Sequence, residues 1–326
     1  MKTKILKPSA KSISQAAKIL CAGGLVAFPT ETVYGLGANA LNAKAVSKIF
    51  KAKGRPSDNP LIVHVSSIEQ VPSLVKKIPN NAKVLMNKFW PGPLTLVLSK
   101  SPEIPKIVTA GLDSVAIRMP AHKVALELIR AVGFPLAAPS ANLSTTPSPT
   151  NALHVFEDLH DRISLILDGG SVRIGVESTV LDLTGRTPTI LRPGAVTLEQ
   201  LRKVLGKVKV HKAVHGVKSK VAKVKSPGLK HKHYSPKAKV LLFTGARAKA
   251  LAKIRKEKSA LEKQGFKAGI ISISSPKALA KSVFKKFREF DTQGVHFILV
   301  AGVEEKGIGF AVMNRLKRAA SKEIKA

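Results

Sequence analysis

Two short polar segments, far apart in the chain, carry side chains that suit a polyphosphate. The first, KGRPSDNP, contains Lys53, Arg55 and Asn59 beside loop-forming glycine and proline. The second, PSAN, places Ser140 and Asn142 directly after an apolar stretch. Fixed cations with hydroxyl and amide donors are what a chain of phosphates requires. Neither G-x-x-x-x-G-K-[ST] nor a complete G-x-G-x-x-G occurs, so a nucleotide would occupy an uncommon kind of site.

Three further polar side chains lie within or beside apolar stretches that are typical of strands. Thr32 lies in the glycine-punctuated segment FPTETVYGLG, for which a decorated turn is the alternative interpretation. His64 lies in the apolar run LIVHV, where a satisfied core histidine and a ligand contact both stay open. Arg118 closes the run VAIR, and an arginine there needs an anionic partner or must reach solvent. These residues are candidates, and none defines a site alone.

A second glycine-rich region, DGGS followed by GVESTV and LRPG, contains Asp168, Glu177 and Arg192. The two carboxylates could serve acid–base chemistry or magnesium, but we favour the interpretation that they fix loops by accepting backbone hydrogen bonds. His231 and His233 have the spacing of metal ligands. Because neither cysteine nor carboxylate lies near them to complete a metal shell, we expect no metal site.

Alternating helical and strand patterns position these candidates. Residues 1–206 predict an α/β domain with a twisted mixed sheet, because strands follow one another directly near its end. Residues 207–238 read as a basic interdomain linker. Residues 239–326 predict three strand–helix units, the pattern of a small parallel, Rossmann-like sheet. The expected strands are 24–29, 61–65, 94–98, 115–118, 134–138, 165–168, 179–183, 189–191, 240–243, 268–273 and 297–300. The expected helices are 13–21, 43–52, 80–90, 121–132, 197–205, 248–264, 276–287 and 310–320.

The composition bounds the class of protein. A chain of 326 residues is long enough for two domains with cores of their own. Its single cysteine, Cys21, excludes an internal disulfide framework and is expected in the core. The apolar runs are too short to span a membrane, and the basic N-terminus lacks the apolar stretch of a signal peptide. We therefore expect a cytoplasmic protein without a membrane segment.

The positive charge is large and uneven. The formal net charge is +35, made of +10 in residues 1–200 and +25 in residues 201–326. Such a field attracts polyanions, among them ATP, tRNA or an acidic partner. A surface that serves only solubility is the open alternative for the C-terminal third.

Taken together and in this order, the motifs resemble the YrdC family of threonylcarbamoyl-AMP synthases, in its long two-domain form. The similarity extends from Ile13 to the last expected helix, and it rests on FPTETVYGLG, K-x-R with NPL, PGPLT, S-x-N, DGG with GVESTV, LRPG and SPGLKHKHYSP. The very basic stretch before Ser226 resembles the family least.

The resemblance implies a reaction. L-threonine and bicarbonate form a carbamate, whose carboxylate attacks the α-phosphate of ATP; pyrophosphate leaves and threonylcarbamoyl-AMP remains. A partner transferase would move the threonylcarbamoyl group to a tRNA adenosine. The enzyme class implied is a nucleotidyltransferase. Mg²⁺ would be held mainly by the phosphates of ATP.

The resemblance also implies residue roles. Lys53 and Arg55 would act at the reacting phosphates. Tyr234, on the linker, would fold over the nucleotide as a lid. The residues expected to contact ATP are Arg55, Asn59, Ser140, Asn142, Ser148, Arg192 and Tyr234. The residues expected to contact threonine are Thr32, His64, Arg118 and Ser178.

The alternative is a double-stranded RNA or tRNA-binding module without catalysis, which the positive charge would also suit. Such a module has no need of a polar strand-end cluster, and it would be expected to use aromatic residues for stacking. Aromatic residues make up only 5% of this chain. Threonine- and bicarbonate-dependent release of pyrophosphate from ATP separates the two hypotheses.

Overall fold

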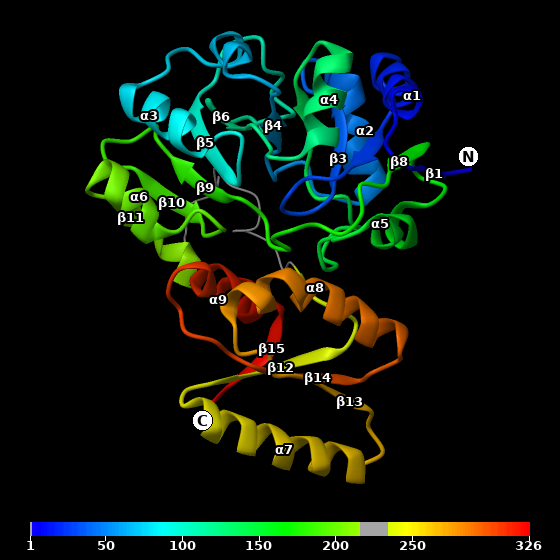
Figure 1. The fold of residues 1–326 in the computed structure, drawn as a ribbon, viewed down its shortest axis with the longest axis vertical. Coiled ribbons are helices and arrows are strands. Elements are labelled where there is room, and N and C mark those ends of the chain that lie inside the picture. Colours follow the sequence, from blue (N-terminus) through cyan, green and yellow to red (C-terminus); the bar gives the residue numbers. More distant parts are fainter. Residues whose placement is uncertain (1, 216–233) are drawn as a thin grey trace.

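The computed structural model describes residues 2–215 and 234–326, which form two α/β units. The large-sheet unit comprises residues 2–215, and the small-sheet unit comprises residues 234–326. Figure 1 shows the first above the second, with helices of the small-sheet unit facing the larger one. The predicted fold class, a mixed sheet followed by a small parallel α/β unit, is confirmed.

The large-sheet unit is built on an eleven-stranded sheet of order β1-β8-β2-β3-β7-β4-β6-β5-β9-β10-β11. The sheet is mixed: for example, β4 pairs with β6 in parallel and with β7 antiparallel. The strands are β1 (Lys4–Leu6), β2 (Val26–Phe28), β3 (Gly35–Asn39), β4 (Ile62–His64), β5 (Leu94–Ser99), β6 (Ser114–Arg118), β7 (Leu136–Ala137), β8 (Leu165–Leu167), β9 (Thr179–Asp182), β10 (Thr189–Arg192) and β11 (Lys209–Val210). The helices are α1 (Ala10–Cys21), α2 (Ala43–Lys53), α3 (Asn80–Phe89), α4 (Lys123–Val132), α5 (Ala152–Leu159) and α6 (Leu198–Leu205).

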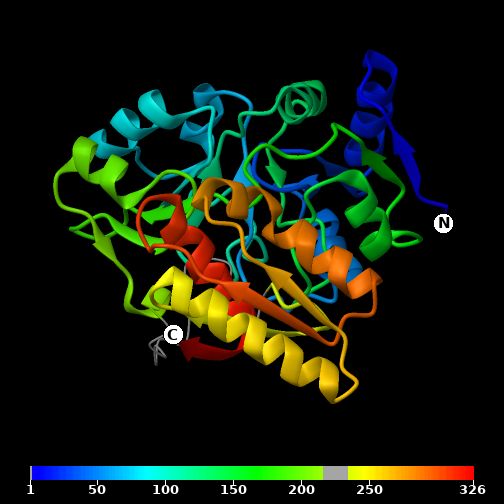
Figure 2. The same ribbon diagram turned by 60° about the horizontal axis from the view of Figure 1, so that its bottom comes forward.

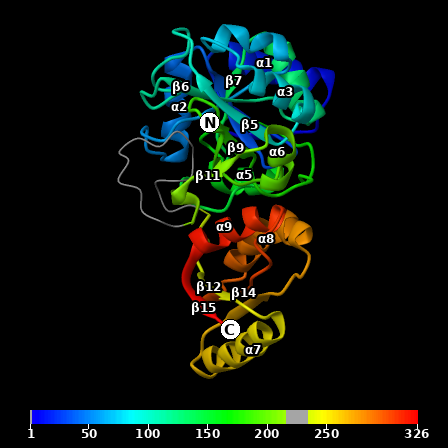
Figure 3. The ribbon, with the colours of Figure 1, turned by 90° about the vertical axis from the view of Figure 1, so that its left-hand side faces the viewer.

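The small-sheet unit has four parallel strands in the order β13-β14-β12-β15. Helix α7 covers one face, while α8 and α9 lie on the face toward the large-sheet unit (Figure 3). Figure 2 shows α7, in yellow, lying across the outer side. The strands are β12 (Lys239–Thr244), β13 (Ala268–Ile271), β14 (Phe297–Ala301) and β15 (Ala320–Lys325), and the helices are α7 (Arg247–Lys263), α8 (Pro276–Thr292) and α9 (Ile308–Ala319).

Helix ends follow local chemistry and set the direction of functional loops. The α6 helix begins with a capping box in which Thr197 and Gln200 satisfy each other's backbone N–H groups. Helix α2 ends at Lys53 because Gly54 adopts a left-handed conformation with φ 59°. The chain therefore turns sharply between Lys53 and Arg55, which places these two cations on different structural elements.

Several elements were not predicted. Strand β3 lies where the sequence predicts a glycine-punctuated loop; a Cβ at Gly37 would come within 2.8 Å of the Phe28 ring, so glycine here gives room for packing. Strand β1, helix α5 and strand β15 were also missed. Strand β15 is a polar sheet edge, ASKEIK, without apolar alternation.

The structure also differs from the sequence-based expectations for Cys21 and for the start of the linker. Cys21 is exposed at the end of α1, so the prediction of a core thiol is wrong. The first residues of the predicted linker form β11, which extends the large sheet, and a 3₁₀ turn, η3 (Lys212–His215). The rest of the linker, apart from residues 234–238, lies outside the described residues, and its boundaries and the proposed lid motion stay predictions. No helix within the described residues is long and apolar enough to cross a membrane.

Candidate active site

One cavity gathers most of the residues that the sequence singles out. Its wall comes from the end of α2, the loop between β2 and β3, strands β4, β6 and β10, the loop after β7, the segment before β9, and Tyr234 of the small-sheet unit. The predicted residues that line it are Thr32, Lys53, Arg55, His64, Arg118, Ser140, Asn142, Ser148, Arg192 and Tyr234. Asn59 and Ser178 do not line it, and both are buried behind lining residues.

Lys53 is the last residue of α2 and is 2% exposed. Its Nζ donates to the backbone carbonyls of Ser140 and Asn142. Burial lowers the pKa of Lys53 well below its usual value, and the charge of Arg55 lowers it further. Lys53 thus belongs to the end of a helix, beside the loop-forming glycine that the sequence indicates, and its side chain fixes the loop that follows β7.

Arg55 is partly buried just beyond the α2 turn, with its Nε fully buried and without a hydrogen bond. Its Nη2 donates weakly to the carbonyls of Asn59 and Pro60, each at 3.3 Å. Burial lowers the pKa of Arg55 to about 10, and the nearby Arg192 adds to the effect. Asn59 thus contributes its carbonyl to holding Arg55. Arg55 remains charged at neutral pH and retains donors for an anionic ligand.

The loop after β7 is fixed by its own polar groups. Ser140 Oγ donates to Asn142 Oδ1 at 2.5 Å. Asn142 Nδ2 in turn donates to the carbonyls of Leu143, at 2.7 Å, and Thr146, at 2.9 Å. The S-x-N pattern therefore shapes this wall, and the backbone of the loop is held from below by Lys53.

Arg192 ends β10 and is 7% exposed. Its Nε donates to the carbonyl of Ser178 and its Nη2 to Ser178 Oγ, both at 3.0 Å. Ser178 Oγ also shares a 2.7 Å hydrogen bond with Thr95 Oγ1. Ser178 was predicted to contact a ligand, whereas the structure places it in direct contact with Arg192, whose guanidinium it orients.

A second polar cluster surrounds Thr32 and His64. Thr32 Oγ1 shares a 2.8 Å hydrogen bond with Thr30 Oγ1. His64 Nδ1 lies 3.2 Å from the Ile62 carbonyl. Burial lowers the pKa of His64 to about 3, and the charge of Arg118 lowers it further. His64 is therefore neutral at physiological pH, and it is both buried in the strand and part of the cavity wall.

Arg118 has an anionic partner that the sequence analysis did not assign. Its Nη2 lies 2.7 Å from Glu31 Oε1, and both side chains are almost fully buried. Neither atom has a well-directed hydrogen bond, and Arg118 Nε donates to the Gly92 carbonyl at 3.2 Å. The sequence offered two signals for this pair: the single carboxylate of FPTETVYGLG and the arginine that closes VAIR. Their proximity is visible only in the structure. The pair leaves polar atoms without hydrogen bonds beside the cavity.

Glu177 has a different role from the one predicted. Instead of accepting backbone bonds, it accepts from Ser148 Oγ at 2.5 Å and pairs with Arg315 Nε at 2.9 Å. Arg315 lies on α9, and no sequence pattern marks it, because one arginine in an amphipathic helix is ordinary. Asp168 does fix its loop as expected, by accepting from the Gly170 N–H at 3.0 Å.

The donor set does not suit a metal cage. Within residues 2–215 and 234–326 no group of three histidine, cysteine, aspartate or glutamate side chains could hold a metal ion. Glu177, which lines the cavity, is already engaged by Arg315 and Ser148. Any magnesium there would have to be held by the ligand's own oxygens.

Comparison with known proteins agrees with this geometry. A model of Sua5, YciO and YrdC proteins, described as "telomere recombination", matches residues 18–194. A model described as "threonylcarbamoyl-AMP synthase, C-terminal domain" matches residues 196–321. This chain belongs to the Sua5/YrdC family of threonylcarbamoyl-AMP synthases.

Individual relatives cover almost the whole chain. A threonylcarbamoyl-AMP synthase of Pyrococcus abyssi is 51% identical over 321 residues, covering 95% of this chain and 94% of the relative. That of Bacillus subtilis is 46% identical, covering 96% and 94%. The crystal structure of P. abyssi Sua5 complexed with L-threonine matches with a TM-score of 0.95 and 48% identity, covering 100% of this chain and 99% of that one. Both units therefore belong to the family's architecture.

Proposed function

We propose that this protein is an L-threonylcarbamoyladenylate synthase, a nucleotidyltransferase that uses L-threonine, bicarbonate and ATP. The observation that carries the proposal is the convergence of Lys53, Arg55, Arg118 and Arg192 on one cavity. Family membership and the names of the relatives support it. The product would serve threonylcarbamoyl modification of tRNA, in the cytoplasm and with a separate transferase.

The chemistry explains why cations matter more than an acid–base pair. The threonine amine and bicarbonate give a carbamate with loss of water. A carbamate oxygen then bonds to the α-phosphorus as the bond from that phosphorus to the bridging oxygen breaks, and pyrophosphate leaves. All reacting groups are anionic, so their repulsion must be screened. The carbamate is already a nucleophile, so positioning and electrostatics can supply most of the rate.

The residues divide between the two substrates. We assign Arg55, Ser140, Asn142, Ser148, Arg192 and Tyr234 to ATP, with Asn59 holding Arg55. For threonine, Arg118 suits the carboxylate, while Thr32 and His64 offer polar groups for the side-chain hydroxyl. Ser178 is assigned to orienting Arg192. That P. abyssi Sua5 has been solved with L-threonine supports an amino-acid site. Magnesium enters with ATP, held mainly by the phosphates.

The decisive experiment measures pyrophosphate released from ATP, and the nucleotide product by mass spectrometry. We expect release only when threonine and bicarbonate are both present, together with threonylcarbamoyl-AMP. Release that ignores threonine, or its absence with all substrates, contradicts the proposal. The RNA-binding module is not favoured, because Lys53, Arg118 and Arg192 are buried around a cavity, where a duplex backbone cannot reach them.

A further inference from the structure

Arg315 connects the small-sheet unit to the cavity wall. It lies on α9 and is 1% exposed. Its Nε donates to Glu177 Oε2 at 2.9 Å and its Nη1 to the Pro193 carbonyl at 2.8 Å. Its guanidinium carbon lies 5.5 Å from the centre of the Tyr234 ring. An arginine this deeply buried is stabilised only where its partners are fixed, and Glu177 and Tyr234 both line the cavity.

Glu177 connects Arg315 to Ser148, because its two carboxylate oxygens bond to one residue each. Its Oε1 accepts the Ser148 hydroxyl at 2.5 Å, while Oε2 pairs with Arg315. Burial favours the neutral acid, but the charges of Arg315 and Arg192 outweigh it and lower the pKa of Glu177. An ionised carboxylate accepts hydrogen bonds and donates none. The single O–H of Ser148 is therefore directed at Glu177.

The direction of that hydroxyl decides what Ser148 can recognise. With its proton given to Glu177, Ser148 Oγ meets a ligand in the cavity as an acceptor. The ionised phosphate oxygens of ATP are acceptors too, so they cannot pair with it. The donors of ATP are the two ribose hydroxyls and the adenine amino group. Ser148 therefore suits the nucleoside half of ATP.

We infer that Arg315 is a positioning residue of the active site, which acts through Glu177 to present Ser148 as an acceptor for a donor group of the nucleoside. The inference rests on the proposed function and narrows it. It also gives the small-sheet unit a part in substrate recognition, because Arg315 of that unit determines that Ser148 of the large-sheet unit meets the ligand as a hydrogen-bond acceptor.

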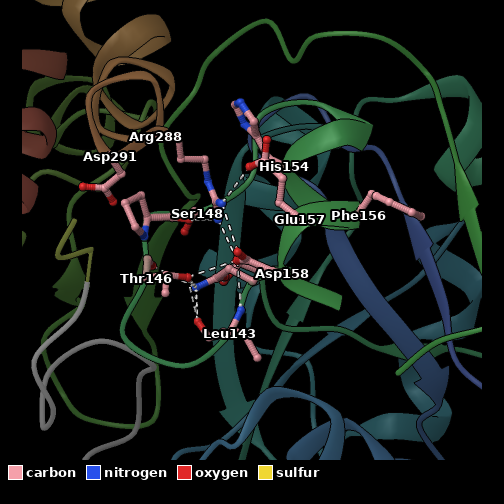
Figure 4. A network of polar contacts seen from close by, with 12 residues as sticks. Leu143, Thr146, Ser148, His154, Phe156, Glu157, Asp158, Arg288 and Asp291 are labelled. Atoms are coloured by element: carbon pink, nitrogen blue, oxygen red, sulfur yellow. Dashed lines mark hydrogen bonds and ion pairs between the residues drawn. The ribbon is translucent and has the colours of Figure 1, made fainter. Parts of the chain in front are cut away.

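A second arginine holds the same loop from its other end. Arg288 of α8 pairs with Asp158 at 2.7 Å and donates to the Pro147 carbonyl at 2.6 Å. Asp158 in turn accepts from the Leu143 N–H and the Thr146 hydroxyl, each at 3.1 Å (Figure 4). The backbone that leads to Ser148 is thus fixed by Arg288, whereas the direction of the Ser148 hydroxyl depends on Arg315.

The first test is a double-mutant cycle on ATP affinity, measured by calorimetry with the full-length protein. Ser148→Ala and Arg315→Met are each expected to weaken ATP binding about tenfold, the upper end of the scale for one hydrogen bond between neutral groups. Together they should weaken it no more than either alone, because Arg315 acts through Ser148. Arg315→Lys should restore part of the affinity. Additive losses would contradict the inference.

Two further variants separate positioning from folding. Lys317→Ala is the matched control: it removes an exposed α9 cation that pairs with Glu305, outside the cavity wall. Its ATP affinity should stay within about twofold. If Arg315→Met does not fold, Glu177→Gln serves instead. The glutamine amide can donate a hydrogen bond to Ser148 Oγ, so the Ser148 hydroxyl no longer has to point at residue 177. Unchanged ATP affinity in Glu177→Gln would contradict the inference.

The second test compares ATP with 2′-deoxy-ATP, 3′-deoxy-ATP, purine riboside triphosphate and tripolyphosphate. The wild type should bind one of the three nucleotide analogues about tenfold more weakly than ATP, and Ser148→Ala should bind it as well as ATP. Tripolyphosphate affinity should not change in Ser148→Ala. Equal binding of all three analogues, or weaker tripolyphosphate binding, overturns the inference. These binding measurements need no turnover. If the expected pattern of affinities is found but no pyrophosphate is released, only the proposed function is contradicted.

Discussion

The cavity and helix α7 use the same kinds of residue for opposite purposes. Around the cavity, Lys53, Arg118 and Arg192 are buried, and their nitrogen atoms are held by carbonyls, a hydroxyl or a carboxylate. Along α7, lysines such as Lys249 and Lys256 are exposed to solvent. Residues 1–200 carry a net charge of +10 against +25 for residues 201–326, yet the cavity cations belong to the less charged part. Placement, and not total charge, identifies the site.

Burial makes these cations costly and therefore informative. Moving a cation out of water costs several kcal/mol unless partners compensate, and the lowered pKa values of Lys53 and Arg55 express that cost. A bound anionic ligand would offset this cost. The charges of α7 are screened by salt within a Debye length of about 8 Å.

The largest effect is expected for Arg55→Ala. Removing a fixed charge beside the reacting phosphates should lower pyrophosphate release about 100- to 1,000-fold. The free energy of unfolding should change little, because the hydrogen bonds of Arg55 to two carbonyls are long and weak. The matched control is Arg186→Ala, an exposed arginine outside the cavity wall. If Arg55→Ala releases pyrophosphate at a rate near that of the wild type, Arg55 takes no part in the reaction.

Lys53→Met should lose stability as well as activity. The two loop carbonyls of Ser140 and Asn142 would lose their donor, and an unsatisfied buried polar group costs about 1–3 kcal/mol. We expect the free energy of unfolding to fall by about 2–4 kcal/mol, measured with urea. Lys51→Met, an exposed change in the same helical turn, should stay within about 0.5 kcal/mol. Equal stability of both variants would show that Lys53 does not hold the loop.

His64 should give the buried cluster an acid-sensitive stability. Its pKa of about 3 in the folded protein lies below its ordinary 6.5, so the unfolded chain binds a proton that the folded chain rejects. Stability is therefore full above pH 6.5 and falls as the pH drops toward 3, by at most about 1.4 kcal/mol per pH unit. His64→Gln should flatten this slope in urea titrations at several pH values. The exposed His160, changed to Gln, should leave the slope as it is, and the same slope in both variants would contradict the burial of a neutral His64.

Much of the fold could be predicted from the sequence, because long periodic segments such as α2, α8 and β5 carry their own signals. The cavity residues could be proposed from their types and from the family resemblance, but their contacts could not. Lys53 and Ser178 were expected to meet a ligand, which stays a prediction; that Lys53 also holds the loop after β7 and Ser178 also contacts Arg192 is information that only the tertiary structure contains. Arg315 was missed because its meaning depends on Glu177, which is 138 positions away. Strand β15 was missed because a polar edge strand has no apolar alternation.

The smallest effect is expected on α7, where the comparison predicts almost none. Changing Lys249 and Lys256 to Glu reverses two exposed charges, and surface charges contribute about 0–1 kcal/mol each. Pyrophosphate release at physiological salt should therefore stay within about twofold of the wild type. The same variant measured at low salt shows whether the basic surface draws ATP to the protein, since only a long-range field is strengthened there. A tenfold loss at physiological salt would mean that α7 takes part in the reaction, and the division between buried, functional cations and exposed, screened ones would be wrong.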